Sequence, residues 1–425
     1  MQEEKLYSRR WAILIAMTCI LVAIQFSFIL PGGAAVLIMQ TYAISPMEFS
    51  MVMSIPYLSG FLFAILAGTL ADRIGINKVI VGGLIIAFIG SCARALSGTS
   101  FILLFGSMFV MGFAMAALNA NSAKLLRTWF PGTANSFAMG VYTAGMSAGA
   151  AIALWYGSHV TSDIWGAWWF SAALIGASTI IWIALYRKHP DGDNIDREPI
   201  AQYLGAVLKN PHVWGISIVA FLVFGMTNVN GTYMVAAITA LAGDPSVVGQ
   251  AGDLSTLNTA IACIASMVLP VVFVAKFKNM RLPVAICLAG TAVCFGLIYF
   301  FPYGVTTWVL YIICPIFMAS LMPIVKMLPT LLPSVKKEQL GVVGGIQATF
   351  QNMGMFLVAS YVLSPIATAV DPSGGVAYYQ VVYVGVAIVC VVAFLSFFLF
   401  PNVRSSVGRK IADEMAAAKG EKVED

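Results

Sequence analysis

Charged residues are scarce in this sequence. Lys, Arg, Asp and Glu together make up 10% of its 425 residues, whereas hydrophobic residues make up 60%. Soluble domains are about one quarter charged, so this composition excludes an ordinary soluble protein. It indicates a chain that is surrounded by lipid.

Residue patterns typical of metal, redox or catalytic chemistry are also missing. The seven cysteines include no CxxC pair, and His159, His189 and His212 lie at or near predicted loops without a matching nucleophile or ligand cluster. We therefore expect no cofactor, no metal and no enzymatic activity. The net charge of +5 is explained by the sidedness described below, so we expect no nucleic acid partner.

Long apolar runs dominate what is present. A helix of about 20 residues crosses the ~30 Å hydrocarbon core of a bilayer, and about twelve runs of this length follow one another. We predict spanning helices over 11–40, 46–71, 79–97, 101–127, 133–158, 165–187, 212–241, 247–274, 282–301, 304–333, 339–369 and 375–400. The one long loop, 187–210, separates six helices from six. The sequence thus predicts an all-α membrane protein with twelve transmembrane helices, in halves 1–199 and 200–425, the second ending in a short tail.

The charges that remain are sorted by side. Basic residues gather in alternate loops and at both termini, whereas the opposite loops carry Glu48, Asp163, Asp244 and Asp371. Because the Lys- and Arg-rich side stays in the cytoplasm, we expect both termini to be cytoplasmic. The apolar run after the basic N-terminus is longer than a signal peptide allows, so we expect an uncleaved first helix. We expect a multi-pass protein of a bacterial cytoplasmic membrane.

The polar strip GTLADRIG, Gly68 to Gly75, lies between the second and third predicted helices. It resembles the G-x-L-a-D-r-x-G loop of the major facilitator superfamily, at the place where that family has it. The resemblance implies the major facilitator fold, secondary transport by alternating access, and a monomer. It also implies that Asp72 helps to close the cytoplasmic side, together with Arg127 at the end of the fourth helix, while Arg73 anchors at the headgroups. The sequence departs from the family at Ile76 and Asn77, where basic residues are usual.

Two segments further along look like copies of each other. KLLRTWFP begins at Lys124 and KMLPTLLP begins at Lys326, each with proline at its eighth position. Glycines nine positions apart follow both, and we expect these helices to pack closely at glycines; the candidates are Gly140, Gly145, Gly149, Gly345 and Gly354. Two matched lysines from opposite halves make an electropositive site or gate, unless each merely reaches the membrane surface. We therefore predict a small organic or inorganic anion as substrate.

A short stretch before the seventh helix points the same way. LKNPHVW, Leu208 to Trp214, is similar to the corresponding segment of oxalate/formate, monocarboxylate and cyanate-type members of the superfamily. The fifth predicted helix lacks the Gly-Pro pair that is usual in drug:proton antiporters of the family, which argues against drug efflux.

Uncharged polar residues inside predicted helices suggest a polar interior. In the superfamily, helices 1, 2, 4, 5, 7, 8, 10 and 11 line the cavity, so polar residues on them are candidate substrate ligands beside the two lysines: Gln25, Tyr142, Asn228, Asn230, Asn258 and Gln347. The alternative is that these amides tie helices together, as amides in membranes commonly do.

Two further charges fall within predicted helices. Arg94 is near the outer end of the third helix, and we expect its side chain to extend to the headgroups. Asp253, in the eighth helix, is a candidate carrier of a coupling proton, or else a residue of the outer vestibule. The second hypothesis for function is therefore a transporter of a neutral, amphipathic or cationic solute, coupled through Asp253. The expected partners are the bilayer, a small solute, and a proton or counter-substrate.

Overall fold

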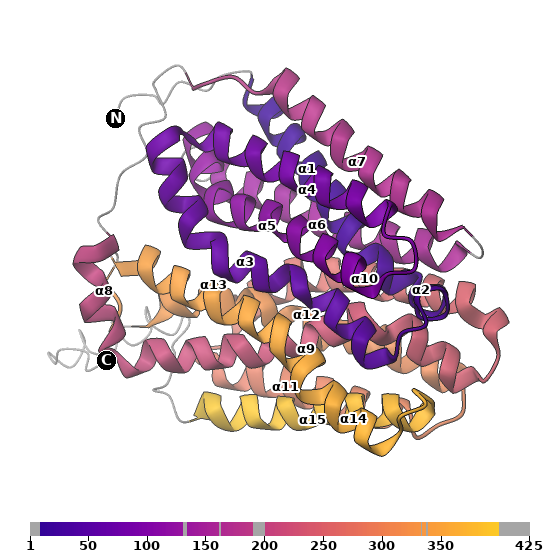
Figure 1. Ribbon diagram of the computed structural model, residues 1–425. Helices are drawn as coiled ribbons and strands as arrows, with labels where there is room; N and C mark the ends of the chain where they lie inside the picture. Colours follow the sequence, from indigo (N-terminus) through magenta and orange to yellow (C-terminus); the bar gives the residue numbers. More distant parts are fainter. Residues whose placement is uncertain are drawn as a thin grey trace, which may run out of the picture.

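The computed structural model describes residues 9–130, 134–160, 163–189, 200–332, 334–336 and 339–398. These residues fold almost entirely into helices (Figure 1). The helices are α1 (Arg10–Gly33), α2 (Ala35–Tyr42), α3 (Pro46–Ile74), α4 (Ile76–Ala95), α5 (Phe101–Trp129), α6 (Ala134–His159), α7 (Ile164–Leu185), α8 (Ile200–Leu208), α9 (Pro211–Ala242), α10 (Val248–Lys276), α11 (Arg281–Ile298), α12 (Val305–Leu331), α13 (Leu340–Leu357), α14 (Ser364–Val370) and α15 (Val376–Phe398).

The predicted membrane architecture is confirmed. In the part of the chain that the structure describes, twelve helical segments are long and apolar enough to cross a bilayer. Large apolar side chains such as Ile102, Ile180 and Val305 are exposed on their outer surfaces, where lipid replaces water as solvent. The chain is therefore an all-α, multi-pass membrane protein.

The first predicted helix is broken. The sequence predicts one helix over 11–40, whereas α1 ends at Gly33 and α2 begins at Ala35, with Ala34 at φ −93° and ψ 20° between them. The break follows Pro31, Gly32 and Gly33; proline removes a helical hydrogen bond and glycine weakens a helix. α2 then leads to the Ser45 turn, where Ser45 and Glu48 form a capping box and Pro46 begins α3.

Two other features of the chain differ from the predicted elements. The long loop between the halves contains a short helix, α8, in addition to irregular chain. The eleventh span is interrupted by a π-helical turn, Val358–Leu363, between α13 and α14. The domain boundary at 199/200 falls where α8 begins, beside residues outside the described part, and it stays a prediction.

One helix of each half, α1 or α9, lies at the contact between the halves. α1 contacts α6 and α7 in the first half, and α9 contacts α13 and α15 in the second. The halves meet along three pairs of helices: α1 with α9, α3 with α13, and α6 with α10. Figure 1 shows the first half, indigo to magenta, lying against the second half, pink to yellow. α1 and α9 are the most buried spans, as expected for helices at the centre of the assembly.

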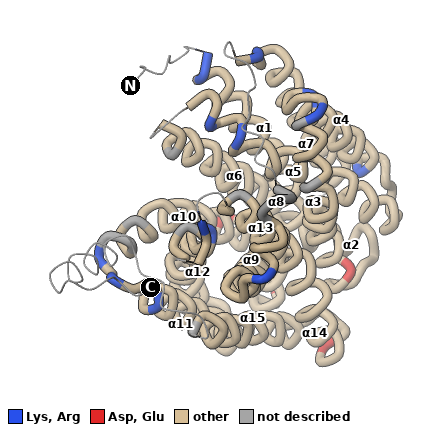
Figure 2. Tube along the Cα trace, turned by 90° about the vertical axis from the view of Figure 1, so that its left-hand side faces the viewer, with Lys and Arg blue, Asp and Glu red and all other residues tan. Residues whose placement is uncertain are grey.

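The two ends of the bundle differ in charge. The basic end contains Arg10, Arg73, Lys78, Arg127 and Lys209, at the start of α1, the α3–α4 turn, the end of α5 and the start of α9. Figure 2, viewed from this end, shows Lys and Arg on both halves. The acidic end contains the loop or helix-start residues Glu48, Asp163, Asp244 and Asp371.

Candidate functional site between the two halves

Two glycines bring the backbones of the halves into contact. A Cβ added to Gly32 of α1 would lie 2.2 Å from the carbonyl oxygen of Gly231 of α9. Real Cβ atoms do not come so near to another atom, so any larger residue at position 32 forces the helices apart. The two central helices therefore touch through their backbones.

Further contacts between the halves that join specific atoms lie toward the acidic end. Ser360, in the π-helical turn, donates to the carbonyl oxygen of Ser50 of α3 at 2.7 Å. Thr256 of α10 is 3.3 Å from the carbonyl oxygen of Ala151 of α6. A Cβ added to Gly374 of the α14–α15 loop would meet Pro46 at 2.4 Å. The halves are thus held together at this end of the molecule.

The predicted glycine contacts are confirmed at three of the five positions. Added Cβ atoms at Gly149 of α6 and Gly354 of α13 would lie 2.5 Å from the carbonyl oxygen of Val22 and 2.0 Å from that of Phe221. A Cβ added to Gly145 would lie 2.8 Å from the Thr18 side chain of α1. For Gly140 and Gly345 the prediction was wrong, because nothing lies within 4 Å of their added Cβ atoms. In each half, therefore, the second glycine of the matched pair is closely packed (Gly149, Gly354) and the first is not (Gly140, Gly345).

Lys326 of α12 extends into the interior of the protein. Its Nζ is 5.6 Å from the ring centroid of Phe224, a fully buried residue near the middle of α9. The Lys326 residue is nevertheless exposed. Among the described residues no carboxylate lies within 4 Å of its ammonium group. Beside it, Gln347 of α13 donates to the Val325 carbonyl oxygen at 2.7 Å, which fixes α12 against α13.

Lys124 occupies the corresponding place in the first half. It lies five residues before the end of α5, as Lys326 lies five residues before the end of α12. Because helical side chains tilt toward the N-terminus, both lysines point away from the basic end and toward the bilayer centre. Lys124 is partly buried. Tyr142 of α6, also buried, hydrogen-bonds with Ser122, two positions before Lys124.

The remaining predicted polar residues hold helices together. Asn230 of α9 donates to Asn258 of α10 at 3.0 Å, and Asn258 donates to the Tyr311 carbonyl oxygen of α12 at 2.6 Å. Asn228 donates to the Met355 carbonyl oxygen of α13 at 2.8 Å. Gln25 is buried beside Gly149. The amide nitrogens of Asn228, Asn230, Asn258 and Gln347 therefore all serve interhelical bonds, and Asn230 Oδ1 alone among their oxygens is both buried and without a partner in the described structure.

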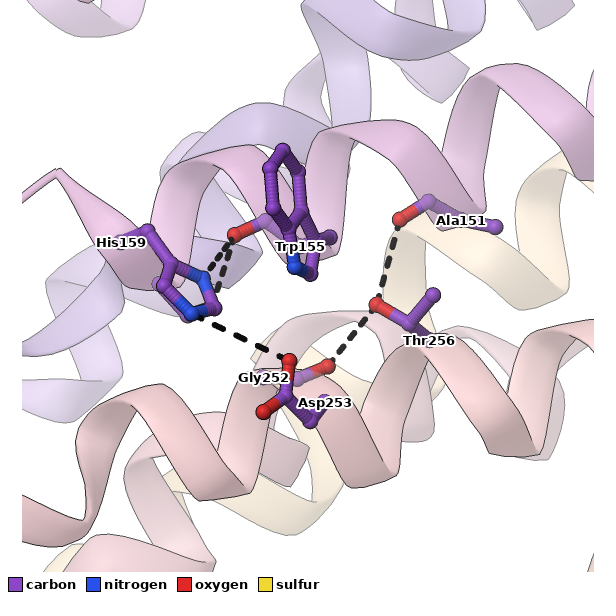
Figure 3. A network of polar contacts seen from close by, with 7 residues as sticks. Ala151, Trp155, His159, Gly252, Asp253 and Thr256 are labelled. Atoms are coloured by element: carbon purple, nitrogen blue, oxygen red, sulfur yellow. Dashed lines mark hydrogen bonds and ion pairs between the residues drawn. The ribbon is translucent and has the colours of Figure 1, made fainter.

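Asp253 lies at the interface of the halves near the acidic end. Its Oδ1 is 3.9 Å from Nε2 of His159, the last residue of α6, and both side chains are about half exposed. Figure 3 shows the two side chains facing each other across the α6–α10 contact, with the Thr256–Ala151 hydrogen bond further along the same contact. Asp253 thus has a cation-forming partner in the other half.

The expectation for Arg94 was wrong. Its side chain does not reach the headgroups but is completely buried between α1, α5 and α7. It donates to the Ser27 carbonyl oxygen at 2.8 Å and to Ser171 Oγ at 2.7 Å, and its guanidinium carbon lies 4.3 Å from the Trp168 ring centroid. A buried cation needs such partners, so Arg94 joins the helices of the first half to one another.

The predicted closure at the basic end is not tested. The backbone of Asp72 lies in the last turn of α3, but its side chain is outside the described part. Arg73 and Arg127 are exposed at this end. Asn77, which replaces a basic residue of the family pattern, accepts a hydrogen bond from Trp182 Nε1 of α7 at 2.9 Å. This bond ties the start of α4 to α7.

Twelve spanning helices in two similar halves, joined at one end and with polar groups between them, define a membrane transport protein. The chain belongs to the Major Facilitator Superfamily, whose family model matches residues 15–359. Its members are transporters and not enzymes.

Solved structures with the same fold confirm this architecture. One is a bacterial homologue of the human lysosomal transporter Spinster, inward-facing and unoccupied (TM-score 0.75, 14% identity, 92% of this chain and 97% of that chain). Another is the nucleoside transporter NupG (TM-score 0.75, 14% identity, 92% and 99% coverage). A third is FucP of E. coli in the outward conformation (TM-score 0.60, 14% identity, 91% and 98% coverage). At this identity they define the fold alone.

Sequence patterns did not indicate the contacts of His159 and Phe224. His159 lies one residue beyond the predicted helix 133–158, and its partner Asp253 is 94 positions away in the other half. Phe224 is one of many phenylalanines in apolar runs, and its position beside Lys326 depends on the packing of α9 against α12. Comparison of the two packed halves singles out Gly32 and Gly231. Each lies ten positions after a residue whose carbonyl oxygen contacts a closely packed glycine.

Proposed function

We propose that this protein moves a small organic or inorganic anion across the membrane by alternating access. In this proposal Lys326, together with Lys124, attracts and holds the anion between the halves. The basic end faces the cytoplasm, in a bacterial cytoplasmic membrane, and the protein works as a monomer. Transport is driven by a co-moving proton or by exchange for a counter-substrate.

The observation that carries this proposal is the environment of Lys326. Its ammonium group lies beside the buried Phe224 ring, the residue is exposed, and no carboxylate lies within 4 Å of the group among the described residues. A charge inside a membrane protein is costly unless it is paired. An anionic substrate supplies the missing negative charge, and the aromatic face supports the cation until the substrate arrives.

The contacts between the halves support a conformation that is open toward the basic end. The atom-to-atom contacts described above lie at or near the acidic end, and Gly140 and Gly345, nearer the basic end, have no neighbour within 4 Å of an added Cβ. The greater similarity to an inward-facing structure than to an outward one agrees with this. In this state an anion reaches Lys326 from the basic side.

A second candidate is a transporter of a neutral, amphipathic or cationic solute coupled through Asp253. The observation that favours it is the half-exposed Asp253 carboxylate at the interface of the halves. In this case Lys326 has a structural role. NupG is a nucleoside transporter and FucP a fucose:proton symporter, but at 14–16% identity these likenesses define the fold alone.

The two candidates differ in which ligands stabilise the purified protein. Thermal unfolding in detergent is measured against acetate, oxalate, nitrate, amino acids, sugars and hydrophobic cations. A ligand at one hundred times its dissociation constant stabilises the folded protein by about 2.7 kcal/mol. We expect stabilisation by one or more of the anions only, and loss of that stabilisation in Lys326→Ala.

Lys78→Ala is the matched control, because Lys78 is an exposed lysine in the first turn of α4. It should keep the full stabilisation by the anion. Stabilisation by sugars or hydrophobic cations, unchanged in Lys326→Ala, would overturn the anion proposal and favour the second candidate.

A further inference from the structure

His159 and Asp253 connect the two halves at the acidic end. His159 is the last residue of α6 and Asp253 lies in the second turn of α10. Their nearest side-chain atoms, Nε2 and Oδ1, are 3.9 Å apart. Beside them the helices pack closely, because a Cβ added to Gly252 would meet the Ser158 side chain, at Oγ, at 1.7 Å (Figure 3).

The surroundings of the imidazole decide which nitrogen carries a proton. Nδ1 of His159 is 2.8 Å from the Trp155 carbonyl oxygen, which only accepts hydrogen bonds, so Nδ1 is the donor. In the neutral ring Nε2 then has a lone pair and faces the carboxylate of Asp253, which is also an acceptor. Protonation at Nε2 supplies the missing hydrogen and a positive charge. The contact therefore changes from unfavourable to favourable when His159 gains a proton.

Other charged groups near this end are already engaged or lie elsewhere. Asp163 of the α6–α7 connection accepts from the Gly166 backbone N–H at 2.9 Å. Asp244 of the α9–α10 connection accepts from Ser246. On α10, Gly249 also lies beside the ring, and a Cβ added there would be 3.7 Å from Nε2. Within the described residues, Asp253 is the one charged side chain within 4 Å of the His159 ring.

Within the described residues, the contact of α3 with α13 and the turn that follows it carries no such pair. There, α3 and the π-helical turn after α13 are joined by the neutral hydrogen bond from Ser360 to Ser50. The α6–α10 interface has its own neutral bond, from Thr256 to Ala151. The charge dependence of closure therefore rests on one pair of residues.

We propose that His159 and Asp253 form a proton-operated latch, which holds the acidic end closed when His159 is protonated. Any opening of the acidic end must separate α6 from α10 and so break the pair. The inference rests on the alternating-access part of the proposed function and not on the choice of substrate. Histidine changes its charge between pH 5 and pH 8, so acidification within this range favours the conformation open toward the basic end.

The latch is tested by a distance measurement without any substrate. Spin labels are placed at Thr99 and Ser373, exposed positions in acidic-end loops of the two halves. The partly exposed cysteines Cys19, Cys92 and Cys263 are replaced by alanine. Double electron–electron resonance then gives the populations of molecules with a short and with a long distance between the two labels. Exposed ion pairs are weak, so between pH 8 and pH 5 we expect the ratio of closed to open acidic ends to rise about two- to fivefold.

Three variants separate the latch from general effects of pH. His159→Asn and Asp253→Asn should each abolish the pH dependence. Thr256→Val, the matched control, removes the neutral bond across the same helices; it should lower the closed population at every pH but keep its dependence on pH.

A pH dependence of the closed population that persists in both His159→Asn and Asp253→Asn would overturn the latch. The latch would also be overturned if the closed population did not change with pH in the protein that keeps His159 and Asp253. Neither result affects the anion proposal, because no ligand is present in this experiment.

Discussion

Gly32 and Gly231 meet at equivalent positions of the two halves. Gly32 lies ten positions after Val22, whose carbonyl oxygen receives Gly149, and Gly231 lies ten positions after Phe221, whose carbonyl oxygen receives Gly354. The contact between the halves is thus made by matching points of two copies of one helix pair. A contact of this kind lies on the pseudo-two-fold axis, where transporters built of repeats place their alternating movement.

Gly32→Val should therefore prevent tight closure at the acidic end. A side chain at position 32 cannot fit 2.2 Å from the Gly231 carbonyl oxygen, so the halves must separate there. We expect the closed population to fall strongly, as measured by the distance between labels at Thr99 and Ser373.

Gly106→Ala in α5 is the control for this prediction, since nothing lies within 4 Å of the added Cβ. It should leave the label distances unchanged. Normal closure in Gly32→Val would mean that the halves close elsewhere.

The glycines of α6 and α13 predict a paired pattern of stability. Gly149→Ala and Gly354→Ala each push a methyl group into a backbone carbonyl of α1 or α9, and forced overpacking costs about 1–3 kcal/mol. Gly140→Ala and Gly345→Ala meet open space and should be neutral or slightly stabilising, because alanine favours helix. Thermal unfolding of the four variants in detergent decides the matter; equal losses at all four positions would contradict the packing.

Arg94→Ala should destabilise the first half. The substitution removes the hydrogen bonds that Arg94 donates to the Ser27 carbonyl oxygen and to Ser171, and it opens a cavity beside Trp168; each polar group left unpaired costs about 1–3 kcal/mol. Arg94→Lys should recover part of the loss, because an ammonium group reaches one partner but does not reproduce the flat guanidinium. Arg73→Ala, at an exposed arginine, is the control. If Arg94→Ala unfolds at the same temperature as Arg73→Ala, the side chain is a surface anchor after all.

The twelve crossings were predictable because each is a long apolar run and lipid imposes that length. The sorting of charges by side, the matched lysines and the glycine copies were likewise visible as patterns along the chain. Such patterns report distance along the sequence and depth in the membrane, which suffice for the order of helices and for the fold.

The errors concern contacts between distant segments. Arg94 resembled an interfacial arginine by its depth, but its partners Ser27 and Ser171 come from two other helices, 67 and 77 positions away. The break at Ala34 follows a recognisable Pro-Gly-Gly stretch, yet prolines also occur within unbroken spans such as α12. Depth alone gives neither the rotation of a helix nor the residue that faces it.

Counterflow into proteoliposomes tests the anion proposal most directly. Vesicles loaded with the anion that gives the largest thermal stabilisation are placed in a trace of the same anion in labelled form. We expect rapid accumulation by the unmodified protein and by Lys78→Ala, and a rate in Lys326→Ala no greater than in protein-free vesicles. Full accumulation by correctly folded Lys326→Ala would contradict the central role of Lys326 in anion transport.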